Sequence, residues 1–201
     1  MATRNYTQRK RAQQQELTRQ RIVAATVELH EELGAARTTV SAVAKRAGVQ
    51  RLTVYRHFPD DAALLEACTT RWLELNPLPT AADWQDVADP LARAVAALGA
   101  FHAYYRRTAR MWHSSYRDRD TVPALAERLA LVERYLDGIA DELTAPLQLT
   151  ARGHRLAGVV VRHGLRFTTW QSLAELGLAE QEMGELVGDW LGGVVGEEIV
   201  G

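Results

Sequence analysis

Residues 50–57 carry a run of hydrogen-bonding and cationic side chains directly after a glycine turn. The run consists of Gln50, Arg51, Thr53, Tyr55, Arg56 and His57. A guanidinium can form two hydrogen bonds to O6 and N7 of guanine, and a side-chain amide can do the same with adenine. Hydroxyl and imidazole groups suit phosphate oxygens, which fix the register of a protein on a duplex. The chemistry that this run could perform is recognition of double-stranded DNA.

The residues before this run predict a short helix and a sharp turn. Thr39 is expected to cap a helix over residues 40–46, and Gly48 allows the left-handed backbone that redirects the chain. With a second helix over residues 50–57, this makes a helix-turn-helix at 39–58, whose second helix would enter the major groove. An ordinary pair of small core helices is the alternative, and the basic, polar face of the second helix argues against it.

The charge of the chain is divided at Pro59. The 201 residues have a formal net charge of −1, but residues 1–59 hold 11 Lys and Arg against four acids, or +7. Residues 60–201 hold 13 against 21, or −8. A basic end fits a nucleic-acid partner, and a merely solvated basic surface is the alternative. Residues 1–14, which contain Arg9-Lys10-Arg11, are predicted to form a flexible basic arm.

Helical periodicity along the rest of the chain predicts an all-α fold. The expected further helices cover residues 15–33, 61–75, 90 to a break near 108, 121–143, 150–176 and 179–195. Asp60 and Asp89-Pro90 have the residue types that begin helices. We therefore expect a three-helix DNA-binding domain with a connecting fourth helix over 15–76, and a second helical domain over 80–201.

Most aromatic residues fall in this second domain, where they could line a pocket for a small molecule. The candidate ligand-binding residues are His102, Tyr105, Trp112, His113, Tyr116, Phe167 and Trp170. Ligand pockets are mainly apolar with a few polar groups that set the orientation of the ligand. The alternative is that each residue is a core or surface aromatic with satisfied hydrogen bonds.

The sequence gives little support to a metal site, a cofactor or catalysis. His102 and His113 do not have the spacing of metal ligands on one helical turn. The single cysteine, Cys68, lies in the apolar part of an expected helix, and Ser114-Ser115 beside His113 does not by itself make a catalytic triad. One cysteine suits a reducing cytoplasm, and no apolar run is long enough for a membrane span. We expect a cytoplasmic protein that is not an enzyme.

The last two expected helices carry opposite charge stripes and a row of glycines. The candidate dimer-interface residues are Arg155, Arg162, Arg166, Glu182, Glu185, Gly184, Gly188, Asp189 and Gly192. Glycines at a spacing of four allow another backbone to come close, and opposed charges could set the register of a four-helix seam between two subunits. Solvated faces and a flexible end of the chain are the alternatives.

About 45 residues, from Arg21 to Leu65, resemble the N-terminal signature of TetR-type transcriptional regulators. The matching residues are Arg21-Ile22, Ala24-Ala25, Gly34, Thr38-Thr39-Val40, Val43-Ala44, Ala47-Gly48-Val49, Tyr55, His57-Phe58 and Leu64-Leu65. The resemblance implies an all-helical homodimer whose first three helices bind DNA and whose C-terminal helices bind a small molecule and dimerise.

Carried over by position, the resemblance assigns roles to the residues of the motif. Thr39 would bind phosphate at the start of the second helix, and residues 50–53, which include Leu52, would read bases. Tyr55 and His57 would contact phosphates, and the full candidate set is Thr39, Lys45, Gln50, Arg51, Leu52, Thr53, Tyr55, Arg56 and His57. Two positions depart from the family pattern, because Leu52 replaces a small residue and Asp61 replaces a lysine that begins the fourth helix.

The expected function is that of a ligand-responsive regulator. We expect a repressor that a small molecule releases from a near-palindromic operator, since a two-fold dimer reads two half-sites. An effector-independent DNA-binding protein is one alternative, and a helical enzyme that uses the aromatic and histidine residues is another. The resemblance does not identify the effector.

Overall fold

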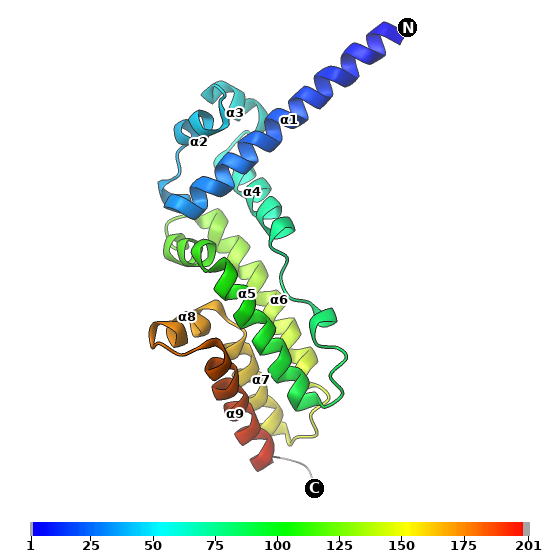
Figure 1. Cartoon of the computed structure of the whole chain (residues 1–201), viewed down its shortest axis with the longest axis vertical. Coiled ribbons are helices and arrows are strands. Elements are labelled where there is room, and N and C mark those ends of the chain that lie inside the picture. The colour runs from blue at the N-terminus through cyan, green and yellow to red at the C-terminus, as the bar shows by residue number, and fades with distance from the viewer. Residues whose placement is uncertain (1, 199–201) are drawn as a thin grey trace. The chain divides into compact units, whose positions relative to one another are not determined.

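The computed structural model describes residues 2–198 and shows helices joined by short connections (Figure 1). The helices are α1 (Ala2–Leu33), α2 (Val40–Ala47), α3 (Arg51–His57), α4 (Asp61–Leu75), α5 (Pro90–Asp118), α6 (Pro123–Thr144), α7 (Ala151–Gly164), α8 (Phe167–Glu175) and α9 (Glu180–Glu198). Short 3₁₀ turns, η1 (Ala35–Arg37) and η2 (Ala81–Asp83), lie between them. The described residues contain no β-strand, which confirms the predicted all-α class.

The chain folds into two compact units. The first unit contains the residues up to Pro77 together with His113–Glu127, and the second contains Leu78–Trp112 and the residues from Arg128 onward. The end of α5 and the start of α6 therefore group with the N-terminal helices. The domains predicted from the sequence are consecutive segments, so that prediction does not place residues 113–127 with the N-terminal helices.

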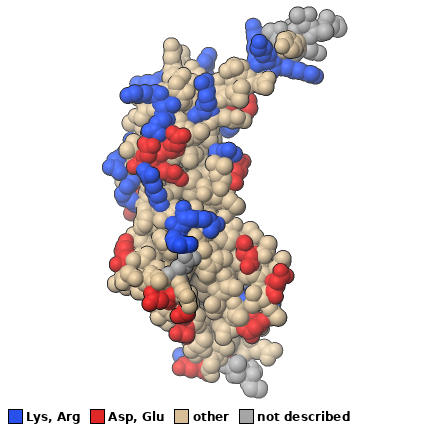
Figure 2. All heavy atoms as spheres, in the orientation of Figure 1, with Lys and Arg blue, Asp and Glu red and all other residues tan. Residues whose placement is uncertain are grey.

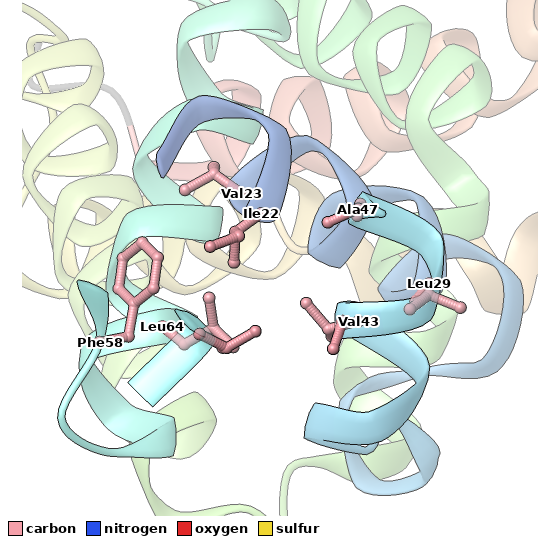
Figure 3. Close-up of a cluster of buried hydrophobic side chains, with 10 residues drawn as sticks. Ile22, Val23, Leu29, Val43, Ala47, Phe58 and Leu64 are labelled. Carbon is pink, nitrogen blue, oxygen red and sulfur yellow. The ribbon is translucent and has the colours of Figure 1, made fainter. Parts of the chain in front are cut away.

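A single apolar cluster holds α1 against the next three helices (Figure 3). Ile22 and Leu29 of α1, Val43 of α2 and Leu64 of α4 are almost completely buried, and Phe58 fills the space after α3. Complete burial of a side chain of this size contributes about 1.5–3 kcal/mol. This cluster fixes the orientation of α2 and α3 and so determines which of their side chains reach solvent.

Helix α1 begins at Ala2, so the structure differs from the predicted flexible arm and from a first helix that starts at Gln15. Residues 2–14 contain neither proline nor glycine and are rich in Ala, Arg and Gln, which have high helix propensity. Figure 1 shows this part of α1 extending beyond the other helices of its unit. The arm is therefore a helical continuation of α1.

The predicted break near Thr108 is absent. Helix α5 is continuous from Pro90 to Asp118, and the Thr108 hydroxyl donates to the Tyr104 carbonyl oxygen at 2.5 Å within the same helix. A β-branched residue lowers helix propensity only slightly, and here the hydroxyl group is satisfied locally. The aromatic segment 111–116 is consequently part of α5.

The single helix predicted over 150–176 is divided into α7 and α8 at Leu165-Arg166. At this break, His102 Nε2 lies 3.0 Å from the Gly164 carbonyl oxygen, and the Tyr105 hydroxyl donates to the Leu165 carbonyl oxygen at 2.8 Å. Carbonyl groups at the end of a helix need partners, and buried side chains of α5 supply them here. The break is a tertiary feature, which explains why local sequence signals missed it.

Gly164 is also required for packing at this break. A Cβ atom at this position would lie 2.6 Å from Leu98 Cδ2 and 2.7 Å from Val187 Cγ1. The end of α7 therefore closes tightly on α5 and α9, which carry these two side chains. Any larger residue would force the core of the second unit to shift.

Candidate nucleic-acid interface

The turn between α2 and α3 is fixed by one cap and one glycine. The Thr39 hydroxyl oxygen accepts a hydrogen bond from the Ala42 N–H at 3.2 Å, which confirms the predicted start of α2. Gly48 ends α2 with φ 66° and ψ 39°, and nothing lies within 4 Å of a Cβ built there. The backbone angles alone require glycine at this position, since other residues rarely adopt a left-handed conformation.

Helix α3 has one buried side and one exposed side. Val54 is 1% exposed and Phe58 is 3% exposed, so these two residues anchor α3 to the core. The opposite side presents Gln50, Arg51, Leu52, Tyr55 and Arg56 to solvent, while Thr53 and His57 are half-buried at its edges. Leu52 is 70% exposed. Of the predicted base-reading residues, Gln50, Arg51 and Leu52 are therefore accessible, and Thr53 is partly so.

The cations of α2 and α3 divide into two groups. Arg46 pairs with Glu28 at 2.9 Å and with Glu32 at 2.8 Å, and these contacts join α2 to α1. Within residues 2–198, Lys45 and Arg51 enter no ion pair, and the described contact of Arg56 is a hydrogen bond to Thr53 Oγ1 at 3.2 Å. Arg46 therefore stabilises the fold, whereas Lys45 and Arg51 remain available to bind an external anion. The sequence alone does not show which of these cations are paired within the fold.

The C-terminal end of α1 is held by residues from the end of α5, which sequence analysis missed. Ser114 Oγ donates to the His30 carbonyl oxygen at 3.1 Å, and Arg117 Nη2 donates to the Leu33 carbonyl oxygen at 2.9 Å. Asp118 accepts a hydrogen bond from the Ala36 N–H at 3.0 Å. These contacts cap the free carbonyl and amide groups where α1 turns into η1. No local pattern in the sequence indicates a cap that comes from residues more than 80 positions away.

Asp118 is ionised in this arrangement. Burial would raise the pKa of its carboxyl group, but hydrogen bonds from Arg117 and from the Ala36 N–H hold that pKa below its ordinary value. Gly34, at φ 89°, is packed so closely here that a Cβ would lie 2.2 Å from Asp118 Oδ2. The corner that leads from α1 to α2 is thus fixed both by charge and by close packing.

Lysine and arginine side chains gather over the N-terminal helices (Figure 2). The exposed cations of this unit include Arg9, Lys10 and Arg11 on the first turns of α1 and Lys45, Arg51 and Arg56 on α2 and α3. Acidic side chains are more prominent over the remaining helices shown in that view. The charge division found in the sequence is therefore a surface feature of the folded chain.

Comparison with known proteins decides the class of this domain. Residues 22–68 match the family described as "Bacterial regulatory proteins, tetR family". Residues 22–68 form a DNA-binding domain of the tetR family. This match confirms the resemblance on which the sequence prediction rests. A search of curated proteins finds no match.

Solved structures show that the similarity of fold extends beyond the TetR-type domain. A transcriptional regulator from Rhodococcus sp. Rha1 is 17% identical with a TM-score of 0.65, covering 91% of this chain and 98% of that one. NalD of Pseudomonas aeruginosa, described as the secondary repressor of the MexAB-OprM multidrug efflux pump, is 18% identical with a TM-score of 0.59, covering 92% and 98%. FadR of Bacillus halodurans, a fatty acid degradation regulator, is 16% identical with a TM-score of 0.57, covering 86% and 93%. At these sequence identities, the structural similarity establishes a shared fold and nothing further.

Five of the seven predicted ligand-binding residues come together in the second unit. Tyr105 lies edge-on to Trp112 with ring centroids 5.6 Å apart and to Phe167 at 5.5 Å, and Trp170 lies 5.6 Å from Phe167. His102 is fully buried at the α7–α8 break beside this aromatic cluster. Phe101 and Tyr104 of α5 also join the cluster, through Tyr105. His113 and Tyr116 group with the TetR-type unit instead.

Two arginines of the predicted dimer seam pair with acids of another helix of the same chain. Arg162 contacts Asp137 and Asp141, and Arg166 contacts Glu133 at 3.5 Å and Asp137 at 3.2 Å. Both arginines are therefore paired with α6 of the same chain and not with acids of α9. The acids of α6 recur every four residues, and this stripe is the sequence signal that could have identified the correct partner.

The other residues of the predicted seam lie on α7 and α9. Arg155 of α7 and Glu182, Glu185 and Asp189 of α9 are exposed. A Cβ on Gly188 would lie 3.3 Å from Val95, so this glycine packs against α5, whereas a Cβ on Gly184 or Gly192 would meet nothing within 4 Å. Gly188 therefore allows close packing within the chain, whereas Gly184 and Gly192 leave open space beside α9.

Two classes of site find no support in the described part of the chain. Residues 2–198 contain no group of three or more metal-ligating side chains that could hold an ion. The helices described here also include none that is long and apolar enough to cross a membrane.

Proposed function

We propose that the chain is a homodimeric, ligand-responsive transcriptional repressor. The observation that carries this proposal is the exposed face of α3, where Arg51 and Arg56 enter no ion pair within residues 2–198. A surface that keeps its cations free of internal partners suits an anionic polymer. Repression is also the described role of NalD, one of the similar structures. Such a regulator acts in the cytoplasm, where the DNA is.

The proposed roles of the reading face follow from position on α3. Gln50 caps the helix and Arg51 begins it, so both side chains stand at the end that enters a major groove. Arg51 suits guanine, Gln50 suits adenine, and the exposed Leu52 can contact a thymine methyl group. Thr39, Lys45, Tyr55 and His57 would bind phosphates, while Arg56 donates a hydrogen bond to Thr53 Oγ1.

The exposed N-terminal turns of α1 extend the same basic surface. Removal of residues 2–14 deletes Arg9, Lys10 and Arg11, which are exposed, together with Arg4. The logarithm of the binding constant falls with the logarithm of salt by about 0.9 for each phosphate contact. We expect the truncated chain to show a shallower salt dependence than the full chain in fluorescence anisotropy with a random-sequence duplex. An unchanged slope would show that this part of α1 does not touch DNA.

Two-fold binding requires a dimer, and the outer face of α7 and α9 is the proposed seam. Val159 of α7 is 57% exposed, and Trp190 of α9 is 39% exposed and stacks on His163 with ring centroids 6.4 Å apart. Gly192 leaves the α9 backbone open to a close neighbour. An apolar and glycine-bearing surface of this kind is typical of an interface between subunits.

Sedimentation at micromolar concentration tests the seam. The Val159→Glu variant places a charge in the proposed contact and should sediment as a monomer, whereas the original chain should be a dimer. Leu131→Glu is a matched control, because Leu131 is 48% exposed on α6, outside the proposed seam. A monomeric original chain, or equal behaviour of the two variants, would contradict the proposed interface.

The aromatic cluster around Tyr105 is the proposed effector site. Its rings are buried, and the hydroxyl group of Tyr105 together with His102 bonds the carbonyl groups at the α7–α8 break. A flat apolar ligand inserted between Trp112 and Phe167 would compete with these contacts and move α5, which also caps α1 through Ser114 and Arg117. Such a ligand would lower operator affinity by a factor that is typically 5- to 150-fold.

The close packing of the same rings favours the alternative of an effector-independent DNA-binding protein. A thermal-shift screen of aromatic and apolar compounds separates the two functions. A ligand at 100 times its dissociation constant adds about 2.7 kcal/mol to stability. A compound that raises the melting temperature and releases operator DNA supports the sensor, while stabilisation without release, or no stabilising compound, supports the alternative.

A further inference from the structure

We propose that the DNA-binding unit itself contains a second small-molecule site, which takes a compact apolar ammonium ion. A cavity of about 450 Å³ lies among α1, the start of α2, the start of α4 and residues 121–124. All these segments belong to the first compact unit. This cavity is here called the α4 pocket, and its lining shares no residue with the aromatic cluster of the second unit.

The walls of the α4 pocket are mainly apolar. Val43 and Leu64 form part of the buried core of the unit, and Leu65, Val122 and Pro123 add further aliphatic surface. Small-molecule sites typically combine such walls with a few polar groups in a volume of about 300–1,000 Å³. A cavity of about 450 Å³ accommodates one aromatic ring or a short branched chain with a polar group.

The charge of the lining determines the sign of the ligand. Asp61 lines the α4 pocket, neither lysine nor arginine does, and Asp61 enters no ion pair within residues 2–198. Burial lowers the pKa of His30, the only histidine in the lining, to about 4, so its ring is neutral at pH 7. The lining therefore carries one negative charge and hydroxyl groups, which together suit an ammonium group.

This assignment accounts for the departure of Asp61 from the family pattern. A carboxylate at the start of α4 benefits from the helix dipole but repels a DNA phosphate. At the edge of an apolar cavity, the same carboxylate attracts a cation. Thr39, the proposed phosphate-binding residue, lines the same cavity, so a bound cation would lie next to the DNA surface.

Fluorine NMR of the full chain tests the site with two matched probes, 4-fluorobenzylamine and 4-fluorobenzyl alcohol, which differ in charge. We expect the amine to bind at least tenfold more tightly than the alcohol. Asp61→Asn should abolish this preference and leave the affinity for the alcohol unchanged. Asp120→Asn is the matched control, because Asp120 is highly exposed and does not line the cavity, and this variant should keep the preference.

A second variant identifies the cavity independently of charge. Val122→Phe fills the space from the chain segment before α6 and should weaken binding of both probes at least tenfold, with the circular dichroism spectrum showing a folded chain. Equal affinity of the amine and the alcohol, equal effects of the two Asp→Asn substitutions, or full binding to Val122→Phe would each overturn the proposal. These measurements contain no DNA, so their failure is distinct from a failure of the proposed function.

Discussion

Arg51 and Arg56 of α3 differ from Arg162 and Arg166 of the second unit in how they use the same side chain. Arg162 on α7 and Arg166 at the start of α8 each contact acids of α6, so the second unit neutralises them internally. Arg51 and Arg56 of α3 are exposed and enter no ion pair within the described residues. An arginine without an internal acidic partner is available to an external polyanion, whereas a paired arginine is not.

Arg46 shows that this difference depends on individual partners and not on the unit. It lies on α2 beside Lys45, yet it pairs with Glu28 and Glu32 of α1 and so stabilises the attachment of the helix-turn-helix. Net charge locates the DNA-binding end of the sequence. It does not distinguish a cation that stabilises the fold from a cation that binds DNA. The pairing seen in the structure makes that distinction.

The largest expected effect compares Arg51 with Arg166. Arg51→Ala should lower operator affinity by about 1–3 kcal/mol at each half-site, because a bidentate contact to a base is lost. Arg166→Ala should leave operator affinity unchanged, since its contacts lie within the second unit. Fluorescence anisotropy with a selected operator measures both variants. Equal losses in the two variants would remove the distinction between free and paired arginines.

A second prediction concerns acid sensitivity of the TetR-type unit. Burial lowers the pKa of His30 from an ordinary 6.5 to about 4, so protons bind the unfolded chain more readily than the folded chain. The stability due to neutral His30 is therefore complete above pH 6.5 and is lost as the pH falls from 6.5 toward 4. By pH 5 the expected loss is about 2 kcal/mol.

Urea unfolding at pH 7.5 and pH 5 measures this loss. The His30→Leu variant has no imidazole to protonate, so its stability should change less between the two pH values. His113→Leu is the control, because His113 is exposed and its removal should leave the pH dependence unchanged. If His30→Leu and the original chain lose equal stability, another group causes the acid sensitivity.

Thr39 is expected to contribute both to stability and to DNA binding. Thr39→Ala removes the oxygen that accepts the Ala42 N–H and should cost about 1 kcal/mol of stability. It should also weaken operator binding, whereas Thr39→Ser should keep both properties. Urea unfolding and anisotropy test the pair. A stable Thr39→Ala variant with weakened binding would assign Thr39 to DNA alone.

The smallest effects come from the adjacent cations of α2. Lys45→Ala should weaken operator binding and reduce its salt dependence without changing stability, because Lys45 is exposed and free of ion pairs within residues 2–198. Arg46→Ala should slightly lower stability, since exposed ion pairs contribute little, and should leave the salt dependence unchanged. A loss of stability in Lys45→Ala together with a reduced salt dependence in Arg46→Ala would contradict the roles given to these two residues.

Sequence predicts most of the helix-turn-helix because its signals are local. Thr39 and Asp60 each cap a helix through their own side chains, and Gly48 has the left-handed angles expected of it. The reading face follows, since Val54 and Phe58 are buried as expected and Tyr55 and Arg56 between them are exposed. The DNA-binding roles of those residues remain predictions.

The features that sequence did not predict depend on contacts between distant segments. The α7–α8 break is stabilised by His102 and Tyr105 of α5, and the α1 corner by Arg117 and Asp118. Arg166 could have met acids on α6 or on α9, and helical spacing alone does not decide between them. In each case the deciding partner lies many residues away, where periodicity and capping rules give no information.

Selection of bound sequences from a pool of random DNA tests the central claim most directly. A dimer that reads DNA through the exposed face of α3 should enrich a near-palindrome whose half-sites lie about 34 Å apart, or a multiple of one helical turn. The Arg51→Ala variant should fail to enrich the same half-site at the position that Arg51 reads. Enrichment of the same sequence by that variant, an enriched sequence without two-fold symmetry, or no enrichment by the original chain would contradict the account.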